Sequence, residues 1–173
     1  MLQKDPEIFE NLVKKHDIDV LCLQETKLQE MHLDDAKLRI RSTILQPDYH
    51  AYYSCSTAKK GYSGTAVFVK RRGKNGRSQS TLDNFFAPKK KPDAEVTEKD
   101  GAGTDEVANL TPTEVSYKMN VSDHDQEGRL IKVDFPLFSL INCYIPNSGQ
   151  KLERLDYRTE QWDKDFLQFV QAI

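Results

Sequence analysis

The stretch DIDVLCLQETK, residues 17–27, decides which fold we expect of this chain. Its residues 19–24 are almost continuously apolar, which is typical of a strand buried on both faces. In front of it, apolar residues recur at helical spacing from Asp5-Pro6 to about His16. A helix followed by a buried strand indicates an α/β fold.

Similar patterns continue along the chain. We expect a helix over 33–45, strands over 50–56 and 64–70 joined around Lys59-Lys60-Gly61, and a hairpin of strands over 129–135 and 138–145. A final helix is expected from about Leu152, with a buried stripe made of Leu155, Trp162, Phe166, Phe169, Val170 and Ile173. Two cysteines within strands, Cys22 and Cys143, are expected to be small core residues.

Composition narrows the class of protein. The chain has 173 residues, enough for one domain, and a net charge of −2, which does not favour a general nucleic-acid binder but allows a local basic patch. No apolar run is long enough to span a membrane, so we expect no membrane partner. The three cysteines show neither metal-ligand spacing nor a disulfide framework, which favours a reducing compartment.

Residues 71–110 interrupt this pattern and separate two parts of one expected domain, residues 1–70 and 111–173. The interrupting segment is basic as far as Pro92 and acidic after it, with polar residues, glycine and proline between the charges. Such a composition cannot bury enough apolar surface to offset the entropy lost on ordering. We therefore expect a disordered loop inserted between two strands.

Short stretches near the ends of the expected strands carry residues suited to phosphate chemistry. Glu25 follows the first strand, where a carboxylate can bind a hard cation such as Mg²⁺; the alternative is a surface salt bridge with Lys27. The glycines at 61 and 64 expose backbone amides that can approach a phosphate, although a simple hairpin turn gives the same pattern.

Two further strand ends carry polar groups. Arg129 stands at a strand entrance, where it can contact a phosphate or pair with Glu127. Tyr144 and Asn147 follow another strand, where a phenol and an amide can hydrogen-bond a phosphate oxygen. The alternative for this second pair is a plain turn, because Pro-Asn-Ser-Gly favours turns.

Taken together, four stretches resemble the exonuclease III class of apurinic/apyrimidinic endonucleases, within the endonuclease/exonuclease/phosphatase superfamily. They are DIDVLCLQETK (17–27), GYSGTAVF (61–68), HDQEGRLI (124–131) and NCYIPNSGQKLERLDYRTEQWDKDF (142–166). The resemblance implies a four-layer α/β/β/α sandwich of the DNase I-like type, with the site at one end of two facing sheets. It also implies a base-excision repair enzyme of the nucleus that cuts DNA 5′ to abasic sites.

The same resemblance assigns roles to individual residues. Glu25 is implied to bind Mg²⁺, with Mn²⁺ as an alternative ion. Tyr144 and Asn147 are implied to be catalytic residues beside the scissile phosphate. The implied contacts to double-stranded DNA are Gly61, Tyr62 and Arg129.

Parts of the family pattern have no counterpart in these 173 residues. Missing are a first strand with Trp-Asn-Val-Asn-Gly, a Gly-Asp-Leu-Asn segment whose aspartate orients the attacking water, and a Ser-Asp-His segment with the catalytic histidine. We therefore expect an incomplete fold and an inactive fragment with exposed apolar surface. Two other functions stay open, a non-catalytic DNA- or clamp-binding module and another phosphodiesterase of the superfamily.

The stretch QSTLDNFF, residues 79–86 of the insert, suggests a second binding function. It fits Gln-x-x-Leu-x-x-Phe-Phe and resembles the motif by which repair and replication proteins bind the sliding clamp PCNA. One helical turn would place Leu82, Phe85 and Phe86 on one side, with Gln79 free to hydrogen-bond at the edge. A chance match and packing of the phenylalanines onto the sheet are the alternatives.

Overall fold

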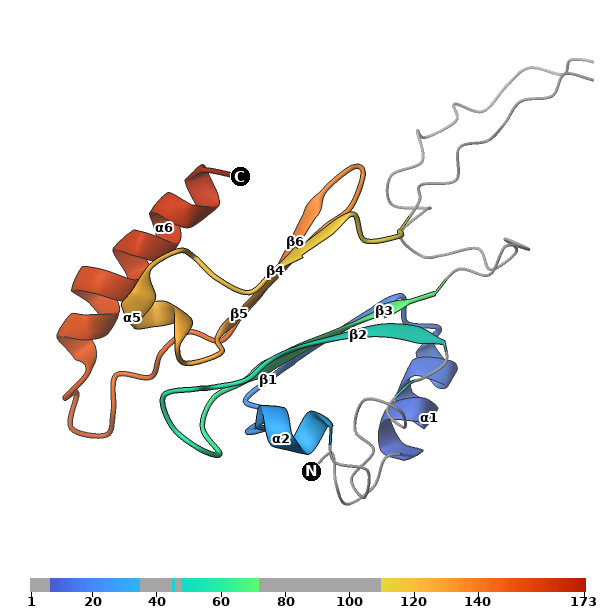
Figure 1. Ribbon diagram of the computed structural model, residues 1–173, viewed down its shortest axis with the longest axis horizontal. Helices are drawn as coiled ribbons and strands as arrows, with labels where there is room; N and C mark the ends of the chain where they lie inside the picture. Colours follow the sequence, from blue (N-terminus) through green and yellow to red (C-terminus); the bar gives the residue numbers. More distant parts are fainter. Residues whose placement is uncertain (1–6, 35–44, 46–47, 72–109) are drawn as a thin grey trace, which may run out of the picture.

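The computed structural model is a sandwich in which two three-stranded sheets face each other between two helical layers (Figure 1). It describes residues 7–34, 45, 48–71 and 110–173. The predicted four-layer α/β/β/α fold is confirmed. The clamp-binding motif of residues 79–86 and most of the helix predicted over 33–45 lie outside the described residues. None of the helices described is long and apolar enough to cross a membrane.

The first sheet has the strand order β1-β3-β2 and is antiparallel throughout. Its strands are β1 (Val20–Gln24), β2 (Tyr49–Ser54) and β3 (Thr65–Lys70), and its outer face carries α1 (Glu7–His16) and α2 (Glu30–Leu33). Side chains alternate along β3, since Ala66 and Phe68 pack toward the helices while Val67 and Val69 pack toward the second sheet. The strand buried on both faces is therefore β3.

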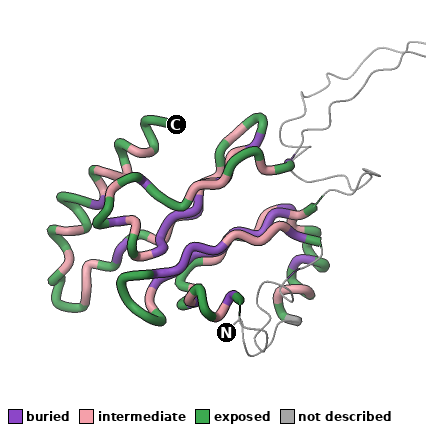
Figure 2. Tube along the Cα trace, viewed as in Figure 1, coloured by how far each residue is buried: buried purple, intermediate pink, exposed green. Residues whose placement is uncertain are grey.

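The second sheet has the order β4-β5-β6 and is also antiparallel. Its strands are β4 (Glu114–Ser116), β5 (Leu130–Asp134) and β6 (Ser139–Cys143). The helices of this half are α5 (Ser122–Asp125), the π-helix η1 (Tyr157–Trp162) and α6 (Asp163–Gln171). Ile131 and Val133 of β5 meet the valines of β3, and buried residues line both of these facing strands (Figure 2). Leu110, placed in the insert by composition, is buried in this same inter-sheet core.

Several sequence predictions of local structure are confirmed, and others are wrong. Both predicted strand pairs form, with β2 against β3 and β5 against β6. The strand β1 lies at the edge of its sheet, with β3 as its only neighbour among the described strands. Its residues are therefore at most half-buried, and Cys22 on it is exposed, so burial on both faces was predicted wrongly. Cys143 is half-buried, and burial raises the pKa of its thiol to about 11, with a smaller opposing effect of Arg129.

The last helix also differs from its prediction. It begins at Leu155 instead of Leu152, and the π-helical turn η1 shifts the phase of the side chains that follow. Trp162 is fully buried, and Phe166 and Phe169 pack against it, as predicted. The remaining members of the predicted stripe, Leu155, Val170 and Ile173, are exposed.

Candidate functional site at one end of the sandwich

The ends of β1 and β6 are joined by side-chain hydrogen bonds between the two sheets. Gln24 Nε2 donates to the carbonyl oxygen of Cys143 at 2.8 Å. Asn142 is 3% exposed, and its Nδ2 donates to the carbonyl oxygens of Leu23 and Ala66, both at 3.0 Å. Because Glu25 directly follows Gln24 and Tyr144 directly follows Cys143, these bonds bring both predicted site residues out at the same end of the sandwich.

The loop after β1 runs along the loop before β3 at this end. The backbone N–H of Lys27 donates to the Ser63 carbonyl at 2.8 Å, and that of Thr26 to the Gly64 carbonyl at 3.0 Å. Glu25, Lys27 and Ser63 have φ angles of 54°, 56° and 50°. A left-handed backbone costs a non-glycine residue about 1–2 kcal/mol, and such strain gathers at functional sites.

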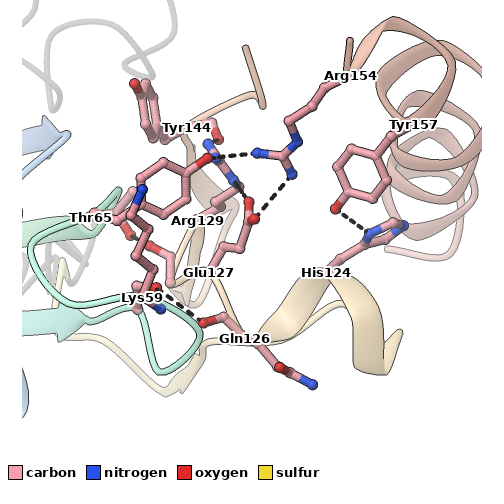
Figure 3. Close-up of polar contacts among 12 residues, drawn as sticks. Lys59, Thr65, His124, Gln126, Glu127, Arg129, Tyr144, Arg154 and Tyr157 are labelled. Atoms are coloured by element: carbon pink, nitrogen blue, oxygen red, sulfur yellow. Dashed lines mark hydrogen bonds and ion pairs between the residues drawn. The ribbon is translucent and has the colours of Figure 1, made fainter. Parts of the chain in front are cut away.

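A buried arginine connects the two predicted site tyrosines. Arg129 is 2% exposed, and its guanidinium lies over the ring of Tyr144, 4.9 Å from the centroid, and near that of Tyr62 at 5.4 Å. It donates to the Tyr62 hydroxyl at 2.8 Å and to the Tyr144 carbonyl at 2.9 Å. The arginine therefore contacts both tyrosines and holds them in place; Figure 3 shows it beside Tyr144.

Glu127 completes this cluster. One carboxylate oxygen accepts from Arg129 Nε at 2.6 Å and the other from Arg154 at 3.0 Å. Arg154 also donates to the Tyr62 hydroxyl, at 2.6 Å. Burial lowers the pKa of the Arg154 guanidinium, but Glu127 and the Tyr62 oxygen outweigh it and leave that pKa raised. Arg154 is thus held as a cation.

This arrangement modifies the role expected of Arg129. Its three guanidinium nitrogens each donate to a group of the protein, and its side chain is buried. Its pairing with Glu127 matches the alternative considered from the sequence, although the pair is buried and not on the surface. Direct contact between Arg129 and DNA stays a prediction, while Tyr62 and Gly61, which are half-buried and exposed, are accessible.

Tyr144 and Asn147 line one shallow pocket, together with Ile145, Pro146, Ser148 and Arg158. The Asn147 side-chain oxygen accepts from the Gly149 backbone N–H at 2.5 Å, so the turn predicted as the alternative is present. That bond uses only the oxygen of the amide. Its Nδ2 group has no partner among the described residues and stays available as a donor for a phosphate oxygen.

Glu25 is suited to hold a metal ion only as a single protein ligand. Its carboxylate is 52% exposed and lies 3.2 Å from the Lys27 ammonium, which is the surface pair considered from the sequence. In the described part of the chain, no three His, Cys, Asp or Glu residues are grouped to bind a metal. Mg²⁺ commonly takes one or two carboxylates and completes its shell with water and substrate oxygens, so an exposed single carboxylate fits that ion.

The histidines show no catalytic arrangement with Glu25. His124 is 2% exposed; its Nδ1 lies 2.9 Å from the Tyr157 hydroxyl and its Nε2 lies 2.9 Å from Asp165 Oδ2 (Figure 3). These contacts join α5 to η1 and α6. His124 therefore has a structural role in the helical layer over the second sheet.

Three residues that build the site, Gln24, Asn142 and Arg154, were given no role from the sequence, and Glu127 was considered only as a surface partner of Arg129. Two of them interrupt apolar strand runs, since Asn142 stands inside FSLINCYI and Gln24 ends DVLCLQ. A polar residue on the inner face of a strand must find a hydrogen-bond partner, and that requirement was the available signal. No comparable signal points to Arg154, which lies in a charged stretch.

The protein is a two-sheet α/β sandwich. Side chains that can bind a phosphate lie together at one end of it, where β1 and β6 end. The sequence pattern of the Endonuclease/Exonuclease/phosphatase family matches residues 3–172, so this chain belongs to that family. The chain is 34% identical to an exodeoxyribonuclease of Bacillus subtilis over 163 residues, which are 94% of this chain and 44% of that protein. It is 33% identical to the DNA repair nuclease APEX1 of Danio rerio over 159 residues, 91% of this chain and 36% of that one.

A solved structure supports the same assignment. The AP endonuclease LMAP of Leishmania major superposes with a TM-score of 0.59 at 25% identity, covering 97% of this chain and 43% of that one. The chain therefore spans less than half the length of each of these relatives.

Proposed function

We propose that this chain forms the DNA-backbone-binding end of a divalent-metal-dependent phosphodiesterase that cuts DNA 5′ to abasic sites in base excision repair. The family membership and the relatives named as AP endonuclease and DNA repair nuclease support this proposal. The observation that carries it is the joining of β1 to β6 by Gln24 and Asn142. These hydrogen bonds bring the Glu25 carboxylate and the Tyr144 phenol to the same end of the sandwich.

Each accessible residue of the edge has a part in the proposed chemistry. Glu25 would hold Mg²⁺, or Mn²⁺ in its place, and a bound ion supplies charge stabilisation at a phosphoryl oxygen and the leaving group. Tyr144 and Asn147 Nδ2 donate to the phosphate and keep it in line. Gly61 and Tyr62 contact the DNA backbone on either side of it.

We propose further that the isolated chain is an inactive fragment, with at most a slow residual cutting of DNA. Among the described residues, Glu25 belongs to no group of three or more His, Cys, Asp or Glu side chains, and the buried His124 is engaged by Tyr157 and Asp165. Without a group that takes a proton from the attacking water, the rate falls by roughly 10²–10⁴-fold. This same observation favours the second candidate function, a module that binds DNA without cutting it.

Incubating the chain with a duplex that carries a tetrahydrofuran abasic-site analogue and Mg²⁺ tests these proposals. We expect salt-dependent binding of the duplex and incision far slower than that by the full-length Bacillus subtilis exodeoxyribonuclease, run as the reference. Efficient incision at low enzyme concentration would refute the proposal of an inactive fragment. Absence of any binding to the duplex at low salt would refute the DNA-backbone role.

For residues 79–86, outside the described residues, we propose binding to PCNA through Leu82, Phe85 and Phe86, with Gln79 at the edge of the contact. A titration of peptide 76–92 against PCNA, beside the Phe85→Ala/Phe86→Ala peptide, tests it. Aromatic anchors supply most of the affinity in such motifs, so the double variant is expected to lose binding. Equal affinity of the two peptides would end the proposal.

We also propose a nuclear location, as suits a repair protein with a basic run at Lys89–Lys91. Imaging the chain as a fluorescent fusion in a nucleated cell checks it. Accumulation in the nucleus is the expected result, and exclusion from the nucleus contradicts the proposal.

A further inference from the structure

We infer that Glu127 is a positioning residue that turns the Tyr62 hydroxyl into a fixed hydrogen-bond donor toward an anionic oxygen of the bound backbone. The inference rests on the proposed function, because it names how one contact of that site is made. Glu127 itself does not touch the ligand in this account. It acts through the two arginines that it holds.

The geometry of the cluster is a closed loop of four side chains. The two oxygens of Glu127 hold Arg129 Nε at 2.6 Å and Arg154 at 3.0 Å. A second nitrogen of each guanidinium donates to the same acceptor, the Tyr62 hydroxyl, at 2.8 Å from Arg129 Nη2 and 2.6 Å from Arg154 Nη1. A planar guanidinium presents donors in fixed directions, so holding one edge of it orients the other.

The consequence for Tyr62 follows from the capacity of a hydroxyl group. A phenol oxygen accepts through its lone pairs and donates one proton. Two guanidinium donors occupy the accepting side, and no acceptor for the Tyr62 proton is found among the residues that the structure describes. The proton is therefore directed outward. A ligand facing it must offer an acceptor such as an unprotonated phosphate oxygen, and not an ammonium group.

The backbone holds Glu127 where this loop needs it. The carbonyl oxygen of Gln126 accepts the N–H groups of Thr57 and Ala58 at 2.8 and 3.1 Å (Figure 3). This contact joins the segment that carries Glu127 to the loop that carries Tyr62. Glu127 is 15% exposed at its side chain, so the pairs it makes are shielded from solvent.

The sign of one measurement separates positioning from plain electrostatics. Replacing Glu127 by Gln removes a negative charge from a DNA-binding edge, which by itself strengthens attraction to phosphate. The Oε1 atom of Gln can still accept from one guanidinium, but its Nε2 group cannot accept from the other. One arginine therefore loses its hold, and the Tyr62 proton loses its fixed direction. Positioning therefore predicts that Glu127→Gln binds the duplex more weakly.

The matched control is Glu153→Gln, which makes the same charge change at an exposed residue of the neighbouring turn. By fluorescence anisotropy on the abasic-analogue duplex, Glu127→Gln is expected to raise Kd about tenfold, the loss of one charge-assisted hydrogen bond. Glu153→Gln is expected to leave Kd unchanged or lower it. Binding by Glu127→Gln that equals or exceeds the wild type would overturn the inference.

A double variant tests whether Glu127 acts through Tyr62. In a Tyr62→Phe background there is no proton to direct, so adding Glu127→Gln is expected to change Kd by less than about twofold. A full tenfold loss in that background would assign Glu127 a role independent of Tyr62 and contradict the inference. Thermal unfolding of each variant controls for folding.

Failure of the proposed DNA-binding function can be told apart from failure of the inference about Glu127. If the wild-type chain binds no duplex, the DNA role fails. The unfolding temperatures of the wild type, Glu127→Gln, Tyr62→Phe and the double variant then decide the inference. Positioning predicts that the shifts of Glu127→Gln and Tyr62→Phe are not additive, because the two side chains share both arginines. Additive shifts would overturn it.

Discussion

The two ends of β3 lie in contrasting surroundings. At the Thr65 end, the strand is fully buried, the Thr65 hydroxyl donates to the Gly128 carbonyl at 3.3 Å, and three loops converge with left-handed residues. At the Lys70 end, the ammonium pairs with Asp17, whose side chain is 57% exposed. One strand thus begins in a tightly determined polar cluster and ends in an ordinary solvated ion pair.

The two ends of β3 therefore differ in how firmly their polar side chains are held. Both ends use charged groups, but only at the Thr65 end are those groups shielded and bonded several times each. Solvent-exposed pairs contribute little to stability, whereas a shielded polar network is costly to break. The following predictions test the difference, from the largest expected effect to the smallest.

The largest effect is expected from Gly128→Ala. Its φ is +63°, and an added Cβ would lie 2.5 Å from the Cys55 carbonyl carbon, which is rigid backbone. We expect a loss of about 3–4 kcal/mol in the free energy of unfolding, measured with urea, because strain and a clash act together.

Gly61→Ala is the matched control for that prediction. Its φ is also +63°, but an added Cβ would meet nothing within 4 Å. Its cost is expected to be about 1 kcal/mol, the backbone penalty alone. Equal losses at the two glycines would contradict the close packing of the site end.

The next effect concerns Asn142 against Asp17. Asn142→Ala leaves the Leu23 and Ala66 carbonyl oxygens without their donor, which is expected to cost about 2–3 kcal/mol. Asp17→Asn breaks the ion pair at the opposite end of β3 and is expected to cost less than about 1 kcal/mol. Urea unfolding of both variants checks the order, and a larger loss for Asp17→Asn would reverse the comparison.

The smallest effect is a pH dependence at the hairpin between β5 and β6, far from the site end. Hydrogen bonds from Lys132 and then Ser139 hold the pKa of Asp134 below its usual 3.8. A lowered folded-state pKa stabilises the fold above the unfolded pKa, and the contribution is lost as pH falls toward the folded value. In urea unfolding at a series of pH values, Asp134→Asn is expected to weaken the loss of unfolding free energy below about pH 4. If the variant loses stability in acid as steeply as the wild type, the prediction is wrong.

The sequence predicted the strand pairs because alternation and turn residues are local signals. RLIKVDF and FSLINCYI became β5 and β6, and the strands predicted over 50–56 and 64–70 became β2 and β3. The burial of β1 was predicted wrongly, because an apolar run does not reveal how many neighbours a strand will have. Cys22 is exposed for this reason.

The candidate site was predicted only at its accessible surface. Glu25, Tyr144 and Asn147 follow strand ends, Tyr62 lies in the glycine turn before β3, and a local pattern marks such positions. The contacts of Asn142 with Leu23 and of Arg154 with Tyr62 join residues about a hundred positions apart, which no local pattern encodes. The burial of Arg129 depends on those same distant partners.

The central claim is that Glu25 binds a divalent ion at the edge where Tyr144 and Asn147 emerge. Mn²⁺ titrated into the isotope-labelled chain, followed by nuclear magnetic resonance, tests it most directly. We predict broadening of backbone signals from residues 24–26 and 144–148, none at Asp17 or Lys70, and loss of the broadening in Glu25→Gln. Broadening confined to other surfaces, or unchanged in Glu25→Gln, would contradict the account.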